Sequence, residues 1–412
     1  MTATTSDRKP GRARRRTGRS RLPVFLVVVP LLLLGVPWWE LVVGGQEWPG
    51  VVVAAATALF ATAYFAMPTL MTLGHGPRQL DAASRAGVLI LGVAWVLFTW
   101  SLFGLVVEAV LAVAGVLDPL RSRILAATVI GVVVVLVAYG MFEARRVPRV
   151  KRVEVRLTGL GSGLDGLSIA VLTDTHYGAI DRSRWSARVV EVVNGLRPDL
   201  VVHAGDLADG TVDRREAQVA PLGDVHAELG RYYITGNHEY YCGALDWVAR
   251  MRDLGWDPLV NRHRVIERGG DRLVLAGIDD PTGAGHSLGP VDGAAADGGV
   301  QGGGPDLAAA LAGADPELPV VLLAHQPSQV RVAEAAGVDL QISGHTHGGQ
   351  IWPFHFLVLT EQPALAGLTR HGDHTQLYTS RGTGFWGPPL RIFAPSEISL
   401  LTLRPAEDDG AA

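Results

Sequence analysis

Long apolar stretches dominate the first third of the chain, whereas the rest alternates short apolar runs with polar segments. Four stretches before residue 145 are each close to the roughly 20 residues that a helix needs to cross a bilayer. They cover residues 22–43, 51–73, 87–110 and 124–142. The pattern predicts an all-α segment of four transmembrane helices. The first stretch is too long, and too closely followed by the second, to be only a cleaved signal peptide.

After residue 145 the apolar runs are short, and each is bounded by turn residues. Runs of this kind predict buried strands, and the stretches between them have the spacing of helices. The expected helices cover residues 182–196, 214–229, 244–254, 307–312 and 328–336. Alternating strands and helices predict an α/β domain. Its polar residues should collect at the carboxyl ends of the strands, where such sheets bind ligands.

Shifts in composition predict where this domain begins and ends. We expect a basic, disordered tail over residues 1–21, a basic juxtamembrane linker over 144–152 and a folded domain over 153–404. Residues 283–304 are rich in Gly, Ala and Asp, which predicts a flexible insertion. Residues 405–412 are expected to form a second disordered tail.

Seven side chains with the chemistry of metal ligands lie at or just after the ends of the short apolar runs. They are Asp174, His176, Asp206, Asn237, His325, His345 and His347. Asp, Asn and His supply the oxygen and nitrogen donors that hold two divalent cations side by side. Because no cysteine thiolate is among them, a hydrolytic site is favoured over a structural zinc site. Gly205, Gly236 and Gly344 suit sharp turns that aim these ligands inward.

The seven residues belong to an ordered series of motifs. The series is D-x-H at 174–176, G-D-x-x-D at 205–209, G-N-H-E at 236–239, a lone histidine after a strand, and G-H-T-H at 344–347. It resembles the calcineurin-like metallophosphoesterase superfamily. The stretches GNHEYYCGALDW, GHTHGGQIWPF and SRGTGFWGPPLR further resemble its membrane-associated bacterial phosphodiesterase branch. The resemblance covers residues 153–403 and implies a sandwich of two mixed β-sheets flanked by helices.

The resemblance also implies a role for each motif residue. Asp174, His176 and His347 would hold one metal ion, Asn237, His325 and His345 a second, and Asp206 would bridge both. His238 would face the substrate, where it would stabilise developing charge or protonate the leaving alkoxide. Asp209 and Glu239 would orient the ligands from behind. The implied cofactor is a pair of divalent ions, and Mn, Fe, Zn and Co all suit these donors.

Several other side chains have chemistry that could serve the site but lie outside the metal-ligand motifs. His203 and His226 lie outside the motifs and are interpreted as ordinary core or surface histidines. His355 either lines the pocket or packs. Arg381 and Trp386, in the glycine-rich turn SRGTGFWGPP, either border the substrate phosphate or belong to loop packing. The single cysteine excludes an intrachain disulfide and is interpreted as a packing residue.

Basic residues cluster at both ends of the apolar region. Eight precede the first stretch, between Arg8 and Arg21, and five follow the fourth, between Arg145 and Arg152. The positive-inside rule therefore places both ends, and with them the folded domain, in the cytoplasm. The alternative is export through a twin-arginine signal at residues 14–16, which would place the domain outside. The residues that follow these arginines lack the hydrophobic pair that such a signal usually carries.

These features predict a membrane-anchored phosphoesterase, with a phosphodiesterase favoured, in which a hydroxide that bridges two metal ions attacks phosphorus. A domain tethered to the bilayer meets lipid-linked phosphoesters at high effective concentration, which adds a lipid-linked substrate to the expectations. The net charge of −4 and the position of the basic residues disfavour duplex nucleic acid as a partner. Two alternatives are a non-catalytic, metal-dependent membrane scaffold and a membrane sensor with phosphoesterase output.

Overall fold

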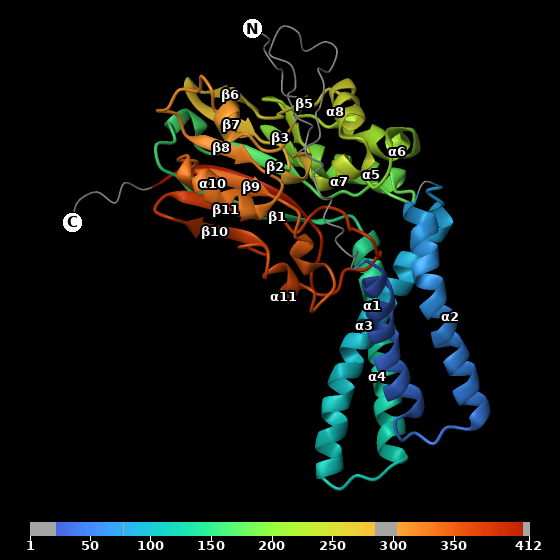
Figure 1. Cartoon of the computed structure of the whole chain (residues 1–412). Helices are drawn as coiled ribbons and strands as arrows, with labels where there is room; N and C mark the ends of the chain where they lie inside the picture. The colour runs from blue at the N-terminus through green and yellow to red at the C-terminus, as the bar shows by residue number, and fades with distance from the viewer. Residues whose placement is uncertain (1–21, 77, 285–302, 407–412) are drawn as a thin grey trace, which may run out of the picture.

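The computed structural model describes residues 22–76, 78–284 and 303–406 (Figure 1). The predicted basic tail 1–21 lies outside the described residues. So do most of the predicted insertion 283–304 and most of the tail 405–412. The segment expected to be a basic linker, 144–152, instead contains the end of the last long helix and the start of the first strand.

The apolar region forms helices, and those corresponding to the second, third and fourth predicted stretches extend beyond the predicted bounds. They are α1 (Leu22–Trp38), continued by a π-helical turn (Trp39–Val43), α2 (Gly50–His75), α3 (Asp81–Val113) and α4 (Leu120–Arg145). Within the described residues, α2, α3 and α4 are long and apolar enough to cross a membrane, by length and composition. Val27–Val43 counts as a shorter apolar helix, so the described residues support three candidate spans where four are predicted. Pro30 and Pro37 lie inside α1, and proline interrupts the regular hydrogen bonding of a helix.

Two six-stranded mixed sheets form the core of the domain that follows. The first has the order β1 (Arg149–Leu157), β12 (Glu397–Pro405), β2 (Ser168–Leu172), β3 (Leu200–Ala204), β4 (Arg231–Ile234) and β5 (Asp257–Pro258). The second has the order β10 (Gly367–His371), β11 (Thr375–Thr379), β9 (Leu340–Ser343), β8 (Val320–Leu323), β7 (Asp271–Gly277) and β6 (Arg262–Arg268). Each sheet mixes parallel and antiparallel pairs, which confirms the predicted two mixed sheets.

The two sheets pack face to face and are covered by helices on their outer faces. Val171 and Val202 of the first sheet share one buried cluster with Leu275 and Leu323 of the second. The outer helices are α5 (Ser183–Leu196), α6 (Val212–Val219), α7 (Asn237–Cys242) and α8 (Ala244–Asp253) on the first sheet, and α9 (Leu307–Ala310) and α10 (Val330–Ala335) on the second. The helix expected over residues 214–229 ends at Val219. A 3₁₀ turn containing Pro221 follows it, because proline has no N–H to continue the helix.

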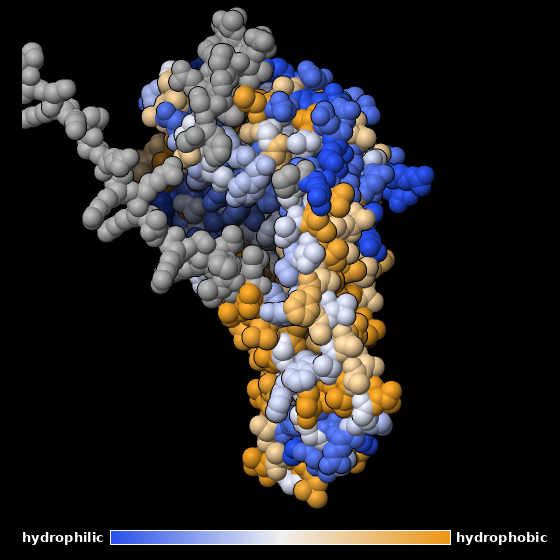
Figure 2. All heavy atoms as spheres, turned by 45° about the vertical axis from the view of Figure 1, so that its right-hand side comes forward, coloured by the Kyte–Doolittle hydropathy of each residue, from blue (hydrophilic) through white to orange (hydrophobic). Residues whose placement is uncertain are grey.

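The domain sits against the side of the long helices rather than only on their ends. Figure 1 shows α11 (His355–Val358) on the face of the domain that points toward these helices. Arg215 of α6 forms a two-armed ion pair with Asp81 at the start of α3, with N–O distances of 2.6 and 3.0 Å. Farther along α3, Gly92 is so close to Pro388 that an added Cβ would lie 2.7 Å from it. Figure 2 shows the apolar surface of the helices below the more hydrophilic domain.

Candidate metal centre

The seven predicted ligands meet where the two sheets adjoin. Asp174 and His176 follow β2, Asp206 follows β3 and Asn237 follows β4, and these three strands are neighbours in the first sheet. His325 follows β8, and His345 and His347 follow β9, its neighbour in the second sheet. Because parallel strands end at the same edge, the loops of both sheets deliver their polar side chains to one place.

One group of donor atoms gathers around His176. Its Nε2 lies 3.1 Å from Nε2 of His347 and 3.5 Å from Oδ2 of Asp206. Oδ1 of Asp174 lies 3.5 Å from the same His347 nitrogen. All four side chains are almost fully buried. The geometry therefore brings together the set expected for the first metal ion, together with the carboxylate expected to bridge.

A second group surrounds the other side of Asp206. Its Oδ2 lies 3.2 Å from Nε2 of His325, and Nδ1 of His345 lies 3.1 Å from Oδ1 of Asn237. Oδ2 of Asp206 is thus within 3.5 Å of a histidine nitrogen from each group. It is the atom that the two groups share.

The donors fit a cation in their chemistry and in their unmet bonding. Ligand atoms of Asp174, His176 and His347 lie within 4.8 Å of one another, as do those of Asp206, His325 and His345. Nδ1 of His325 is 2.7 Å from the carbonyl oxygen of Ala204, which assigns its proton to that nitrogen and leaves Nε2 with a free lone pair. This Nε2 is buried and makes no well-aligned hydrogen bond among the described residues, although Oδ2 of Asp206 lies 3.2 Å away. A cation between the nitrogen and the carboxylate would give both of these buried groups a partner.

Backbone geometry at the site is unusual for residues with side chains. Five of the seven ligands have a positive φ, namely Asp174 (53°), His176 (43°), Asp206 (54°), His345 (70°) and His347 (51°). Non-glycine residues seldom adopt this conformation, which persists where the surrounding structure enforces it and concentrates at functional sites. The strand-to-loop turns therefore fix the positions of the predicted ligands.

The three motif glycines serve two different purposes. Gly205 has a φ of +93°, as expected for a sharp turn. Gly236 and Gly344 instead allow close approach. A Cβ on Gly236 would lie 2.2 Å from Oδ1 of Asp206, and one on Gly344 would lie 2.2 Å from Oδ2 of Asp174. The expectation of a sharp turn thus identifies the right residues but gives the wrong reason for two of them.

Two carboxylates contact the predicted ligands or the backbone beside them. Oδ1 of Asp209 lies 2.9 Å from Nδ1 of His176, which leaves the opposite nitrogen of that ring facing the donor group. Although burial opposes ionisation, the imidazoles of His176 and His238 hold the pKa of Asp209 well below its usual range. Glu239 accepts hydrogen bonds from the backbone N–H groups of Gly236 (2.6 Å) and Leu207 (2.8 Å). Burial and the nearby Asp206 carboxylate raise the pKa of Glu239 to about 8.

His238 lies at the mouth of the centre. Its Nδ1 is 2.7 Å from Oδ1 of Asp209, and its Nε2 is 4.0 Å from Oδ2 of Asp206. Burial lowers its affinity for a proton, but the two carboxylates outweigh burial and raise the pKa of His238 to about 9. The exposed rings of Tyr241 and Trp386 stand beside it, with ring centroids 5.4 and 5.9 Å away. Trp386 therefore lies beside His238, the position expected of a residue that borders the substrate.

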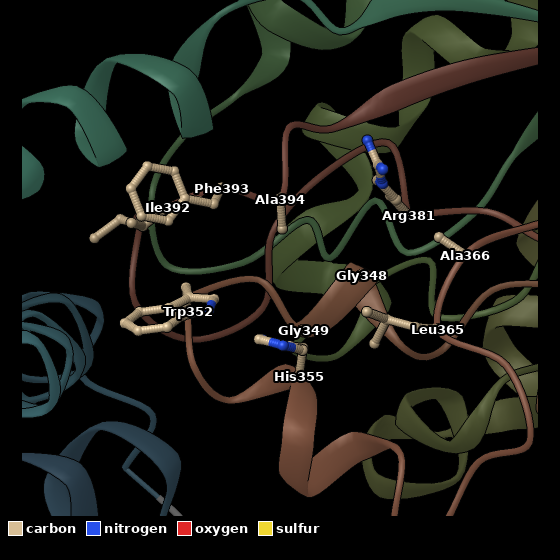
Figure 3. Close-up of a pocket in the computed structure, with 10 residues that line it drawn as sticks. All are labelled: Gly348, Gly349, Trp352, His355, Leu365, Ala366, Arg381, Ile392, Phe393 and Ala394. Atoms are coloured by element: carbon tan, nitrogen blue, oxygen red, sulfur yellow. The ribbon is translucent and has the colours of Figure 1, made fainter. Parts of the chain in front are cut away.

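The remaining sequence candidates occupy other places. His355 and Arg381 line a pocket of about 350 Å³ next to the centre (Figure 3). His203 is buried beside the hydroxyl of Thr175, at 3.1 Å, and is not part of the donor groups, whereas His226 is exposed. Sγ of Cys242 accepts a hydrogen bond from the N–H of Gly210.

Two buried arginines support the centre and were not singled out from the sequence. Arg391 donates to the backbone carbonyl groups of His347 (3.0 Å) and Gly384 (2.5 Å), and Arg182 donates to that of His176 (2.6 Å). Burial lowers the pKa of each arginine to about 10. Arg391 lies in the stretch GPPLR that carries part of the resemblance, whereas no sequence signal marks Arg182.

Comparison with known proteins agrees with this site. A family model for calcineurin-like phosphoesterases matches residues 167–349. A transmembrane protein with a metallophosphoesterase domain from Danio rerio is 37% identical over 284 residues, covering 66% of this chain and 61% of that protein. This chain thus spans about three fifths of that relative's length. A metallophosphoesterase from Helicobacter pylori strain J99 is 35% identical over 280 residues, covering 67% of this chain and 70% of that protein. A dimetal phosphatase structure from Danio rerio covers 53% of this chain and 88% of its own, with 17% identity and a TM-score of 0.35.

Proposed function

The chain belongs to the calcineurin-like metallophosphoesterase family, and from this premise we propose that it is a membrane-anchored phosphodiesterase that uses two divalent cations. The observation that carries the proposal is the position of Asp206. Its Oδ2 lies 3.5 Å from Nε2 of His176 and 3.2 Å from Nε2 of His325, between two groups of donors. A carboxylate in this position can serve two cations at once.

Each cation has its own set of residues. Asp174, His176 and His347 would hold the first, Asn237, His325 and His345 the second, and Asp206 both. Bound divalent cations would polarise the phosphoryl oxygens and make a water molecule nucleophilic at neutral pH. Mn, Fe, Zn and Co all suit nitrogen and oxygen donors.

His238 is the residue placed to handle a proton during the reaction. Asp209 fixes its ring through Nδ1, which leaves Nε2 directed toward the donor groups. A protonated His238 can donate from Nε2 to the oxygen that leaves phosphorus. The choice of a diester rests on the stretches GNHEYYCGALDW, GHTHGGQIWPF and SRGTGFWGPPLR, which resemble the phosphodiesterase branch of the family. The rings of Trp386 and Tyr241 both pack edge-on beside His238.

We place the catalytic domain on the cytoplasmic side of the membrane. The domain ends of α2, α3 and α4 carry more basic residues than their far ends do. Arg78, Arg85, Arg145, Arg146, Arg149, Lys151 and Arg152 lie at or near the domain, against Arg121 and Arg123 at the far end. Such a bias favours the cytoplasm, whether or not α1 crosses the bilayer. A domain held at this surface would meet lipid-linked phosphoesters at high local concentration.

The choice between diester and monoester can be tested on the full-length protein in lipid nanodiscs. The protein is stripped with chelator, resupplied with Mn, Fe, Zn or Co, and assayed on bis(p-nitrophenyl) phosphate and on p-nitrophenyl phosphate. We expect metal-dependent hydrolysis with a higher kcat/KM for the diester. A higher kcat/KM for the monoester would contradict the assignment as a phosphodiesterase. The broader assignment as a phosphoesterase would still stand.

A further inference from the structure

We propose that the substrate is a membrane phospholipid, whose phosphodiester reaches the metal centre sideways from the bilayer over an apolar surface of the catalytic domain. The proposal rests on the proposed phosphodiesterase activity and names its substrate class. The surface, which we term the ledge, consists of Phe354, Phe356, Leu357, Leu359, Trp386 and Phe393.

The ledge concentrates the exposed apolar side chains of the domain. Ten large apolar side chains are exposed among the described residues from 146 to 406, and six of them belong to the ledge. Phe356 is 62% exposed, Phe393 60% and Leu357 53%. Exposed apolar side chains gathered in this way on a folded domain mark a surface that contacts a partner or a membrane.

The ledge adjoins helix α3, one of the candidate membrane spans. The ring of Phe354 lies 5.7 Å from that of Trp95. Trp352, which precedes the ledge, stacks on Phe103 at 5.7 Å with an interplanar angle of 17°. Because Trp95 and Phe103 lie within α3, the ledge is continuous with the apolar surface of the helices. This continuity identifies the lipid bilayer as what the ledge contacts.

A pocket of about 350 Å³ lies between the ledge and the metal centre. In Figure 3, Trp352, Ile392 and Phe393 stand on one side of it and Arg381 and Leu365 on the other. Gly348 and Gly349, which directly follow the ligand His347, form part of its wall. Apolar and aromatic walls with one guanidinium suit an amphiphilic molecule with an anionic group, because arginine binds phosphate and carboxylate oxygens.

The part of the metal centre beside His238 also lies close to the membrane helices. The ring of Trp386 lies 5.9 Å from that of His238, and Pro388, two residues farther along the chain, packs on Gly92 of α3. Two extended residues span about 7 Å. A phosphodiester at the bilayer surface therefore needs only a short lateral movement to reach His238, and its acyl chains can stay in lipid.

The reaction on such a substrate is a hydrolysis. One P–O bond forms to the oxygen of a water molecule, one ester P–O bond breaks, and the released alkoxide takes up a proton. Depending on which ester bond breaks, the products are diacylglycerol and a phosphorylated headgroup, or phosphatidic acid and a free headgroup alcohol. Mass spectrometry distinguishes the two outcomes.

Photo-crosslinking tests lipid contact at the ledge without relying on activity. The full chain is placed in nanodiscs of phosphatidylethanolamine, phosphatidylglycerol and cardiolipin, with a trace of phosphatidylglycerol that carries a diazirine on one acyl chain. We expect adducts on peptides covering residues 354–359 and 386–393, in addition to α2, α3 and α4. Peptides around Val265 and Val332, which are exposed but outside the ledge, serve as the internal control. Adducts confined to the helices would overturn the proposal.

A substitution in the ledge tests lipid turnover in the same nanodiscs. The double variant Phe356→Ser/Leu357→Ser is compared with Val332→Ser, each first checked for a wild-type melting temperature. The measured quantity is the rate on nanodisc phospholipid divided by the rate on bis(p-nitrophenyl) phosphate. We expect this ratio to fall by about tenfold or more in the ledge variant, because much of the binding energy of a lipid comes from its apolar part. In the control the ratio should stay within about twofold of wild type, since an isolated surface substitution changes little.

Assays of the wild-type protein on both substrates distinguish a failure of this proposal from a failure of the proposed function. Hydrolysis of bis(p-nitrophenyl) phosphate without release of phospholipid products would overturn the phospholipid substrate and leave the phosphodiesterase intact. Metal-loaded protein that hydrolyses neither substrate would contradict the proposed function itself. An unchanged ratio in the ledge variant, with phospholipid turnover present, would overturn the role of the ledge.

Discussion

Asp209 and His238 form a direct pair at the mouth of the metal centre, with Oδ1 of the carboxylate 2.7 Å from Nδ1 of the imidazole. The same carboxylate oxygen lies 2.9 Å from Nδ1 of His176. One side chain thus fixes both a predicted ligand and the residue proposed to donate a proton. The link couples the binding of cations to the orientation of the proton donor.

Removing His238 should impair turnover more than cation binding. We expect His238→Ala to lower kcat on bis(p-nitrophenyl) phosphate by about 10²–10⁴-fold, the usual contribution of a positioned general acid. The seven predicted ligands remain in this variant, so its metal content should match that of the wild type. Bound metal is measured by mass spectrometry and kcat by steady-state kinetics on the same sample, for the variant and for the wild type. Wild-type kcat would show that His238 has no part in the reaction.

Asp209 is expected to act through the histidines it contacts. Asp209→Asn should lower kcat by about 10–100-fold, the usual effect of losing a group that orients a metal ligand. Since part of this loss arises through His238, the same substitution should cost less in a His238→Ala background. Comparing the four proteins of this double-mutant cycle measures the coupling. Equal effects of Asp209→Asn in both backgrounds would mean that Asp209 does not work through His238.

Gly344 is predicted to tolerate no side chain. In Gly344→Ala the new Cβ would lie 2.2 Å from Oδ2 of Asp174 and from Oγ1 of Thr173, so the ligand must move. We expect this variant to lose metal and activity together. Gly195→Ala is the matched control, because nothing lies within 4 Å of its Cβ and it sits in α5. That substitution should leave activity unchanged and favour the helix by about 0.5–1 kcal/mol. Wild-type metal content in Gly344→Ala would contradict the close approach.

The Arg215–Asp81 pair should stabilise the junction between the domain and α3. Arg215 is 5% exposed and also donates to the carbonyl oxygen of Asp209, at 3.2 Å. Hydrogen bonds to charged groups are worth about 1.5–3 kcal/mol. We therefore expect Arg215→Ala to lower the melting temperature in detergent by several degrees. Arg188→Ala, on the exposed face of α5, should leave it unchanged. Equal melting temperatures for the two variants would show that the junction does not depend on this pair.

The sequence predicts the residues that meet at the metal centre better than it predicts the residues and sheets that hold them there. Asp174, Asp206 and His325 each follow a short apolar run, and the ends of neighbouring parallel strands must lie side by side. The pairing of two mixed sheets came from the resemblance, because a buried strand looks alike in either sheet. Arg182 escaped notice because it acts on backbone carbonyl groups, which any sequence provides.

The junction with the membrane helices was also beyond the reach of the sequence. The contacts of Trp352 with Phe103 and of Pro388 with Gly92 join segments about 250–300 residues apart, and no local pattern encodes such a pairing. Trp95 lies well inside the third apolar stretch, away from the membrane interfaces where tryptophan is enriched. Its contact with Phe354 gives it a packing role against the domain.

The central claim is that Asp206 serves two cations, and one measurement tests it most directly. Full-length wild type and Asp206→Asn are purified in nanodiscs, stripped with chelator, resupplied with Mn or Zn, and measured for bound metal and for hydrolysis of bis(p-nitrophenyl) phosphate. The account predicts two metal ions per chain and turnover in the wild type, with both largely lost in Asp206→Asn because each donor group loses a shared ligand. An Asp206→Asn protein that binds two ions with wild-type affinity and hydrolyses the diester at the wild-type rate would contradict it.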